Sequence, residues 1–357
     1  MKLYAVIMCG GRGERFWPLS RRRRPKQFIT LFGGSSLTRQ TSDRVRGLCP
    51  PERQLFVAPA EFAPLLRQQT RPGRSSLLLE PCGRNTAPAI GLAAAWLSSK
   101  EPDSVMLVLP ADHVIEPRHE FERSVRLAAR LAQDGMLVTF GIPPTRPDTG
   151  YGYVQVGDRL AGRGRLTAHR VRAFKEKPGL ATARRYVRQG SFLWNSGMFV
   201  WRVDAILDAF RRFMPGYRRE LDRFRAAVGT RREAAALRVL YDRAPSTSID
   251  YAVMEKAENV AAVRATFAWD DVGSWLALER HSPKDRDGNV RRGFCYAPGS
   301  ERCIILSDSG LVAAVGVAEL VVVRAGDAVL VCSRDRLGDL KPLLKRLARD
   351  PRAKRFL

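Results

Sequence analysis

The strongest constraint on the fold is the alternation of short apolar runs with helical patterns over the first part of the chain. Apolar runs suited to buried strands occupy residues 3–8, 54–58, 76–79, 105–109 and 136–141. Between them, Phe121, Val125 and Ala128 recur every three or four residues and mark one helical face. This alternation predicts an α/β fold with a mostly parallel, Rossmann-like sheet and helices on both faces. Ligands of such sheets bind beyond the carboxyl ends of the strands.

The pattern changes to shorter β-rich pieces from about Asn289 onward. Strand candidates lie at residues 303–306, 311–315, 320–324 and 328–332, and a terminal helix has Leu340, Leu343, Leu344 and Leu347 on one face. Residues 282–289 are polar and rich in turn formers, so we place a boundary there. The sequence thus predicts a large domain at residues 1–285. A small β-rich domain with a terminal helix follows at residues 286–357.

The first apolar run ends in a glycine-rich, basic loop, GGRGERFWPLSRRRRPKQF, at residues 10–28. Glycines after a buried strand leave backbone N–H groups free to wrap a phosphate chain, and Arg15 and Lys26 add positive charge. The loop is not a Walker A motif, since no Lys-Ser or Lys-Thr follows at the required distance. Nor is it a dinucleotide fingerprint, because Phe16 stands in place of the third glycine. We predict a phosphate-binding loop, with a simple tight turn as the alternative.

Two further motifs follow strand candidates. Asp112 comes directly after the run at residues 105–109, where its carboxylate either binds Mg²⁺ beside the phosphate loop or caps the next turn. Asn85 and Thr86 open a helical stretch at residues 87–97, which they either cap or use to present hydrogen-bonding groups to a ligand.

The glycine-rich string resembles the amino-terminal signature of sugar-nucleotide pyrophosphorylases, and its WPLS and PKQF parts resemble the mannose-1-phosphate guanylyltransferase branch. Further motifs occur in the order of that family: LEPCGRNTAP at 79–88, TGYGY at 149–153, FKEKP at 174–178, WNSGMFVW at 194–201 and WDDVGSW at 269–275. The resemblance spans residues 1–285 and, more loosely, the tail. It implies a nucleotidyltransferase (GT-A-like) sheet and a small β-helix-like domain that contributes to a homodimer.

The resemblance also implies a role for each matched residue. Nucleotide-binding residues would be Gly10, Gly11, Arg12 and Gly13 at the phosphates, with Glu80, Pro81, Asn85 and Thr86 beside the base. Sugar-phosphate contacts would come from Gly150, Tyr151, Glu176, Lys177 and Asn195. The metal ligands would be Asp112 and Asp271, with Asp270 orienting the loop, although a one-residue slip between the two acids stays open.

The reaction implied by the resemblance converts GTP and mannose 1-phosphate to GDP-mannose and pyrophosphate. Attack by the sugar phosphate needs no catalytic base, because that oxygen is already an anion. Arg15 would hold the triphosphate, and Lys26 would neutralise charge at the reacting phosphates, with Mg²⁺ as cofactor. The sequence contains no Ser-His-Asp or Cys-His set, which agrees with direct displacement. Alternatives are another sugar phosphate, another nucleotide or a non-catalytic regulatory paralogue.

Composition excludes several other classes. The net charge of +25 comes from arginines spread along the whole chain, without a basic segment interleaved with aromatics, so we expect no specific nucleic-acid partner. No apolar run approaches the length of a membrane helix, and no secretion signal opens the chain, so we expect a cytoplasmic protein. The six cysteines form no CxxC pair, which argues against zinc and a disulfide framework.

Overall fold

The chain forms two compact units in the computed structural model, which describes residues 1–11, 13–70 and 77–357. The large unit comprises residues 1–10, 41–111 and 115–269 in their described part. The small unit comprises residues 11–40, 112–114 and 270–357, again in their described part. Segments far apart in the sequence therefore fold together in each unit.

The large unit is built on a nine-stranded sheet of order β3-β2-β1-β4-β9-β6-β10-β8-β7. Its strands are β1 (Leu3–Met8), β2 (Gln54–Pro59), β3 (Leu77–Glu80), β4 (Val105–Pro110), β6 (Leu137–Ile142), β7 (Tyr153–Arg163), β8 (Leu166–Lys175), β9 (Phe192–Arg202) and β10 (Val260–Arg264). Strands β9 and β8 run opposite to the other strands of this sheet. The predicted mostly parallel sheet is therefore confirmed.

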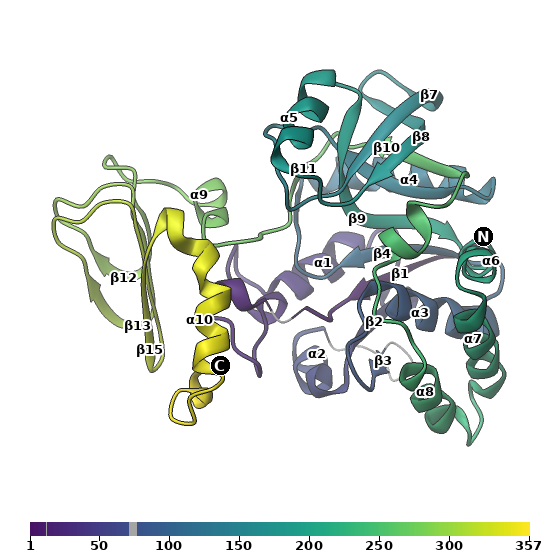
Figure 1. Ribbon diagram of the computed structural model, residues 1–357, viewed down its shortest axis with the longest axis horizontal. Helices are drawn as coiled ribbons and strands as arrows, with labels where there is room; N and C mark the ends of the chain where they lie inside the picture. The colour runs from purple at the N-terminus through teal and green to yellow at the C-terminus, as the bar shows by residue number, and fades with distance from the viewer. Residues whose placement is uncertain (12, 71–76) are drawn as a thin grey trace. The chain divides into compact units, whose positions relative to one another are not determined.

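Helices cover both faces of this sheet (Figure 1). Leu137 belongs to the core that includes side chains of α3 (Thr86–Lys100), α6 (Val203–Phe213), α7 (Pro215–Ala227) and α8 (Glu233–Asp242). On the same strand Phe140 points the other way and lies 6.3 Å from Phe121 of α4 (Arg118–Gln133), between ring centroids. The remaining helices of this part are α1 (Leu37–Val45), whose first residues belong to the small unit, α2 (Ala63–Thr70) and α5 (Leu180–Gln189).

The small unit is rich in β-structure and has a helix near the carboxyl terminus, as the sequence predicts, and its four-stranded sheet begins with a strand that lies outside the strand candidates. Its strands are β12 (Val290–Tyr296), β13 (Ile304–Ala313), β14 (Leu320–Ala325) and β15 (Ala328–Ser333). The first three pair in parallel, and β15 is antiparallel to β14. Helices α9 (Ala277–His281) and α10 (Leu340–Leu347) complete it. Short strands β5 (Val114–Glu116) and β11 (Ala268–Asp270) cross from one unit to the other.

The glycine-rich loop packs into the core of the small unit. Phe16 and Trp17 are buried in one cluster with Trp275, with strand residues such as Ile304 and with Leu344 of α10. Trp275 Nε1 donates to the Trp17 carbonyl at 3.3 Å, and Trp17 Nε1 donates to a carbonyl near the carboxyl terminus at 2.8 Å. The loop is thereby anchored to segments that lie far away in the sequence. The domain boundary at residue 285 stays a prediction.

One local prediction is wrong. The expected separate strands at 303–306 and 311–315 are one strand, β13, whose two parts both pair with β12 on either side of a bulge, since Arg292 pairs with Leu306 and Phe294 with Leu311. The residues after Asn195 form an irregularity inside β9, where Gly197 has a φ of +68° and the register with β6 shifts. Among the described residues, no helix combines the length and the apolar character needed to cross a bilayer.

Candidate active site

A pocket of about 440 Å³ lies wholly within the small unit. Its lining comes from the glycine-rich loop, from the turn after β4, from the loop after β11 and from α10. The lining residues are Gly13, Glu14, Arg15, Phe16, Lys26, Asp112, His113, Asp271, Val272, Gly273 and Lys341. Five residues expected from the sequence, Gly13, Arg15, Lys26, Asp112 and Asp271, are therefore brought together.

Gly13 is required where the loop turns against Lys26. Its φ is +62°, in the left-handed region that favours glycine, and a Cβ built there would lie 2.2 Å from the Lys26 Cβ. Gly11 is held from the other side, because Gln27 Nε2 donates to its carbonyl at 2.8 Å. Arg12 lies outside the described residues. The loop is thus folded tightly over the lysine that it carries.

Lys26 is buried, yet its ammonium group reaches the pocket. Its Nζ lies 2.7 Å from Asp112 Oδ2, donates to the Asp271 backbone carbonyl at 2.7 Å and lies 5.8 Å from the Phe16 ring centroid. One lysine therefore joins the loop, the turn after β4 and the loop after β11. These contacts fix the ammonium group between the two candidate metal ligands.

Asp112 is ionised under ordinary conditions. Burial opposes its negative charge, but the positive charges of Lys26 and His113 and the hydrogen bond from Lys26 outweigh burial and hold its pKa below the usual value. Its side chain is 34% exposed, and its second oxygen, Oδ1, lies 3.9 Å from His113 Nε2. Asp112 therefore presents a carboxylate to the pocket.

The neighbouring acids Asp270 and Asp271 have different surroundings. Asp270 is buried and accepts hydrogen bonds from Arg280, from His281 Nε2 at 2.8 Å and from the Val272 backbone N–H at 2.8 Å. Burial disfavours its charge, but these donors hold its pKa far below the usual value. Asp271 instead lines the pocket, with its carboxylate over Gly273. The two side chains thus divide into an anchor and an acid that faces the pocket.

Arg15 and Lys341 are the exposed cations of the pocket. Arg15 makes one long hydrogen bond of 3.4 Å from Nη1 to the Gly273 carbonyl. Sequence reasoning missed Lys341, which lies in α10, at the far end of the chain from the loop. Its only sequence signal is a basic residue beside the leucine stripe of a terminal helix, which is typical of any solvated helix face.

The residues expected at the base lie in the large unit, at the end of β3 and the start of α3. Glu80 is buried, its Oε1 accepts from the Tyr241 hydroxyl at 2.9 Å, and burial raises its pKa to about 7. Asn85 caps α3 by accepting from the Thr86 N–H at 2.8 Å, and the Thr86 hydroxyl accepts from a backbone N–H at 2.9 Å. Pro81 is exposed. Asn85 therefore caps the helix, which was one of the two alternatives for this residue. Among the residues expected at the base, Glu80 is distinguished by its raised pKa.

The residues expected at the sugar form a polar network in the large unit. Asn195 Nδ2 donates to Asp250 Oδ1 at 2.8 Å, and the Thr139 hydroxyl lies 2.9 Å from Asn195 Oδ1. Lys177 Nζ lies 2.5 Å from Glu176 Oε1. Burial and then the negative charge of Glu176 raise the pKa of Asp250 to about 6. The sequence analysis did not assign Asp250 to the site, so this carboxyl was missed.

Gly150 and Tyr151 lie at a turn before β7 in the same unit. The Gly150 N–H donates to Asp148 Oδ1 at 2.8 Å. The Tyr151 ring lies 5.1 Å from that of Trp194 and 5.2 Å from that of Trp269, between centroids. The turn therefore carries an aromatic cluster near the start of β9.

Comparisons with known proteins define the class to which this fold and pocket belong. Residues 4–288 match the family model described as nucleotidyl transferase, and residues 299–347 match the MannoseP isomerase/GMP-like beta-helix domain. The chain is a nucleotidyltransferase.

Relatives narrow the class to a family. A mannose-1-phosphate guanylyltransferase of Klebsiella pneumoniae is 41% identical over 98% of this chain and 75% of its own length. The protein of the same name from Escherichia coli (strain K12) is 40% identical over 98% of this chain and 74% of its length. A crystal structure described as mannose-1-phosphate geranyltransferase from Thermus thermophilus is 39% identical, with a TM-score of 0.87, and covers 97% of this chain and 99% of the other. The chain belongs to the mannose-1-phosphate guanylyltransferase family.

Proposed function

We propose that this enzyme transfers a guanylyl group from GTP to mannose 1-phosphate, releasing pyrophosphate and forming GDP-mannose. The observation that carries the proposal is the single pocket in which Arg15, Lys26, Asp112 and Asp271 meet from three distant segments. A pocket with cations and carboxylates side by side suits a polyphosphate together with a divalent ion. The names of the relatives supply the base and the sugar.

The reaction requires positioning more than proton transfer. A phosphate oxygen of mannose 1-phosphate attacks the α-phosphorus of GTP, the bond to the bridging oxygen breaks, and pyrophosphate leaves with the electron pair. The nucleophile is already an anion, so no side chain has to remove a proton. The main barrier is the approach of two polyanions, which oriented cations lower.

Lys26 and Arg15 fit the two ends of this task. The ammonium group of Lys26 is held by Asp112 and by the Asp271 carbonyl, so it meets the reacting phosphates without a search through side-chain conformations. Arg15 is exposed and has one weak contact, so its guanidinium is available to the triphosphate.

The carboxylates of the pocket fit Mg²⁺. This ion takes one or two carboxylates and fills its other positions with substrate oxygens and water. Asp112 and Asp271 provide two such groups, and the described residues contain no cluster of three or more ligand side chains that would make a closed site. Asp270 is committed to Arg280 and His281, which favours Asp271 as the second ligand. When bound, the ion would supply positive charge to the phosphate oxygens.

Recognition of the base and sugar would fall to the large unit. Guanine presents N1–H and an amino group on one edge, and the ionised Glu80 is an acceptor for both. Adenine lacks this pair of donors. Glu176, Asn195 and Asp250 would bind sugar hydroxyls, and Lys177 the sugar phosphate. Homodimer formation and a cytoplasmic location stay predictions.

The test is a matrix of substrates. Pyrophosphate release is measured with each nucleoside triphosphate against mannose, glucose and glucosamine 1-phosphates, with and without Mg²⁺. We expect the highest kcat/KM for GTP with mannose 1-phosphate and loss of turnover after chelation. Another preferred pair would replace the substrate assignment, and turnover with no pair would sink the enzymatic proposal in favour of a regulatory paralogue.

A further inference from the structure

Lys341 belongs to the pocket although it comes from the terminal helix of the small unit. Leu340 and Leu344 of α10 are buried in the core that also holds Phe16 of the glycine-rich loop. This packing fixes the rotation of the helix. Lys341, next to Leu340, is therefore turned to the pocket lining that Arg15 also enters.

Lys341 also stands at the border with a second, smaller pocket. That pocket, of about 120 Å³, shares Glu14 and Lys341 with the first and adds basic side chains of the loop and of α10, Arg21, Arg22 and Lys345. Lys341 therefore lies where the two pockets meet, whereas Lys26, Asp112 and Asp271 line the first pocket and not the second.

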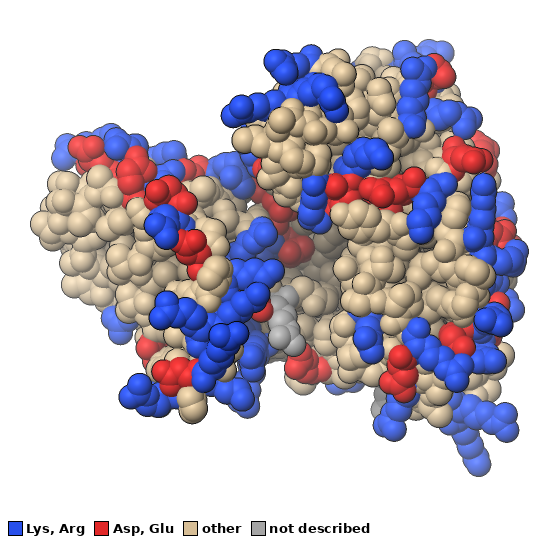
Figure 2. Space-filling model, viewed as in Figure 1, with Lys and Arg blue, Asp and Glu red and all other residues tan. Residues whose placement is uncertain are grey.

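The ammonium group of Lys341 has no partner, whether by an ion pair or a hydrogen bond, among the residues that the structure describes. Arg21, by contrast, pairs with Asp327 at 2.6 Å and donates to the Ala325 carbonyl at 3.0 Å. Figure 2 shows basic side chains gathered over helix α10. Lys345 and Arg346 lie in the last turn of this helix. Of the basic residues in this helix, Lys341 is the one that lines the larger pocket.

We propose that Lys341 is a catalytic residue that binds the pyrophosphate end of the triphosphate and neutralises the leaving group. This inference rests on the proposed function and extends it by giving the helix of the small unit a direct contact with substrate. Lys26 lies between the two carboxylates and would meet the reacting phosphate, so a cation at the border with the second pocket would meet the distal phosphates. Negative charge grows there as the bond to the bridging oxygen breaks, and an ammonium group held near it by the packing of α10 stabilises that charge.

The experiment compares Lys341→Ala with Lys341→Arg and with Arg346→Ala. Arg346 is an exposed cation of the same helix that lines neither pocket, so it controls for net charge. We expect Lys341→Ala to lower kcat about tenfold and to raise the KM of GTP, and that of pyrophosphate in the reverse direction, about tenfold or more, without changing the KM of mannose 1-phosphate. Lys341→Arg should recover most of the loss, and Arg346→Ala should match the wild type.

A binding measurement separates this inference from the proposed function. Inorganic pyrophosphate with Mg²⁺ is titrated calorimetrically into the full chain and into each variant. Weaker binding by Lys341→Ala alone supports the assignment, even if no substrate pair turns over. Equal binding by wild type and Lys341→Ala overturns it, even in an active enzyme. Equal losses in Lys341→Ala and Arg346→Ala also overturn it, because they would reflect overall charge.

Discussion

The candidate sugar site of the large unit and the pocket of the small unit differ in whether their exposed or polar side chains already have hydrogen-bond partners in the protein. In the large unit, Asn195 is already bonded to Asp250 and lies within hydrogen-bonding distance of Thr139. In the small unit, Arg15 has one weak contact, and Lys341 has no partner among the described residues. Sugar hydroxyl groups are recognised through hydrogen bonds of defined direction, and a network of side chains that are already hydrogen-bonded to one another holds donors and acceptors in fixed orientations. Phosphates are bound mainly by positive charge, so exposed cations without strong protein partners are suited to bind them.

The comparison predicts its largest effect at Asp271. Asp271→Asn removes one negative charge from the pocket and keeps the shape, so we expect kcat to fall about a thousandfold with little change in stability. Steady-state kinetics and urea denaturation of the same variant measure the two effects. A kcat within about tenfold of the wild-type value would show that Asp271 is not a metal ligand in the reaction.

Asp270→Asn is the matched control for Asp271. Because Asp270 accepts bonds from Arg280, His281 and the Val272 N–H, its loss should lower the free energy of unfolding by about 2 kcal/mol. Its kinetic defect should be smaller than that of Asp271→Asn. The reverse order would mean that the metal ligand is Asp270.

The second prediction concerns Glu80, whose pKa is raised to about 7 by burial from an ordinary value of 4.5. Between these values the folded protein binds more protons than the unfolded chain, so the contribution of Glu80 to stability falls as the pH rises through this window. At pH 8, ionisation of the buried Glu80 lowers the free energy of unfolding by up to about 3 kcal/mol. Glu80→Gln should therefore be more stable than the wild type at pH 8 and close to it at pH 4.5, by urea denaturation without nucleotide.

Binding of GTP should show the opposite trend at Glu80. Only the ionised carboxylate accepts both guanine donors, so the KM of GTP should fall as the pH rises past 7. In Glu80→Gln the pH dependence of the KM of GTP should disappear, while the pH dependence of the KM of mannose 1-phosphate should match that of the wild type. An unchanged pH profile in the variant would separate Glu80 from the base.

The third prediction tests the pre-bonded network through Asp250. Asp250→Asn keeps the size but removes the negative charge and leaves a weaker, neutral acceptor for the Asn195 amide, so the KM of mannose 1-phosphate should rise about tenfold. The KM of GTP should not change. Lys256→Gln, an exposed change at the end of the same segment, serves as the control. Equal effects on both substrates would argue against a sugar-specific network.

Those features of the two sites that depend on local sequence could be predicted. Alternation of apolar runs predicted the sheet, and the family resemblance assigned Arg15, Lys26, Asp112 and Asp271 to one phosphate and metal site. Lys341 and Asp250 escaped, because nothing local distinguishes them from a solvated lysine or a helix acid. Their positions depend on packing between distant segments, such as Leu344 against Phe16, which periodicity does not encode. The burial of Glu80, which shifts its pKa, likewise follows only from the fold.

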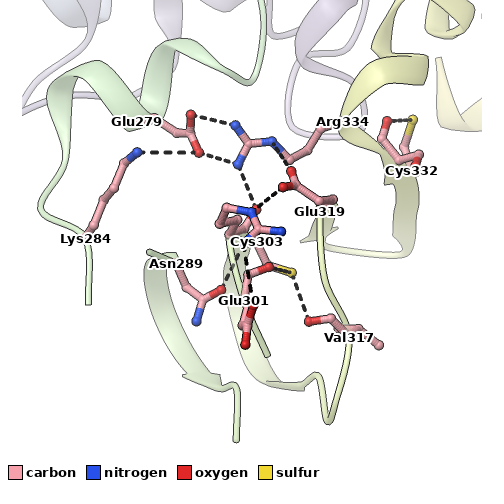
Figure 3. Close-up of polar contacts among 11 residues, drawn as sticks. Glu279, Lys284, Asn289, Glu301, Cys303, Val317, Glu319, Cys332 and Arg334 are labelled. Atoms are coloured by element: carbon pink, nitrogen blue, oxygen red, sulfur yellow. Dashed lines mark hydrogen bonds and ion pairs between the residues drawn. The ribbon is translucent and has the colours of Figure 1, made fainter. Parts of the chain in front are cut away.

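The smallest effect should come from Arg334, which lines neither of the two pockets. Figure 3 shows its contacts with Glu279 and Glu319 in the small unit. Its guanidinium contacts both oxygens of Glu279, at 2.5 and 2.8 Å, and lies 3.2 Å from Glu319. Arg334→Ala should lower the free energy of unfolding by about 1–2 kcal/mol, because the half-buried Glu279 would keep, among the described residues, only the weak ion pair with Lys284 at 3.9 Å. Activity below the unfolding transition should stay at the wild-type level, measured as kcat and both KM values. A selective rise in the KM of GTP would show instead that this network, and not only the core around Leu344, positions α10 and Lys341.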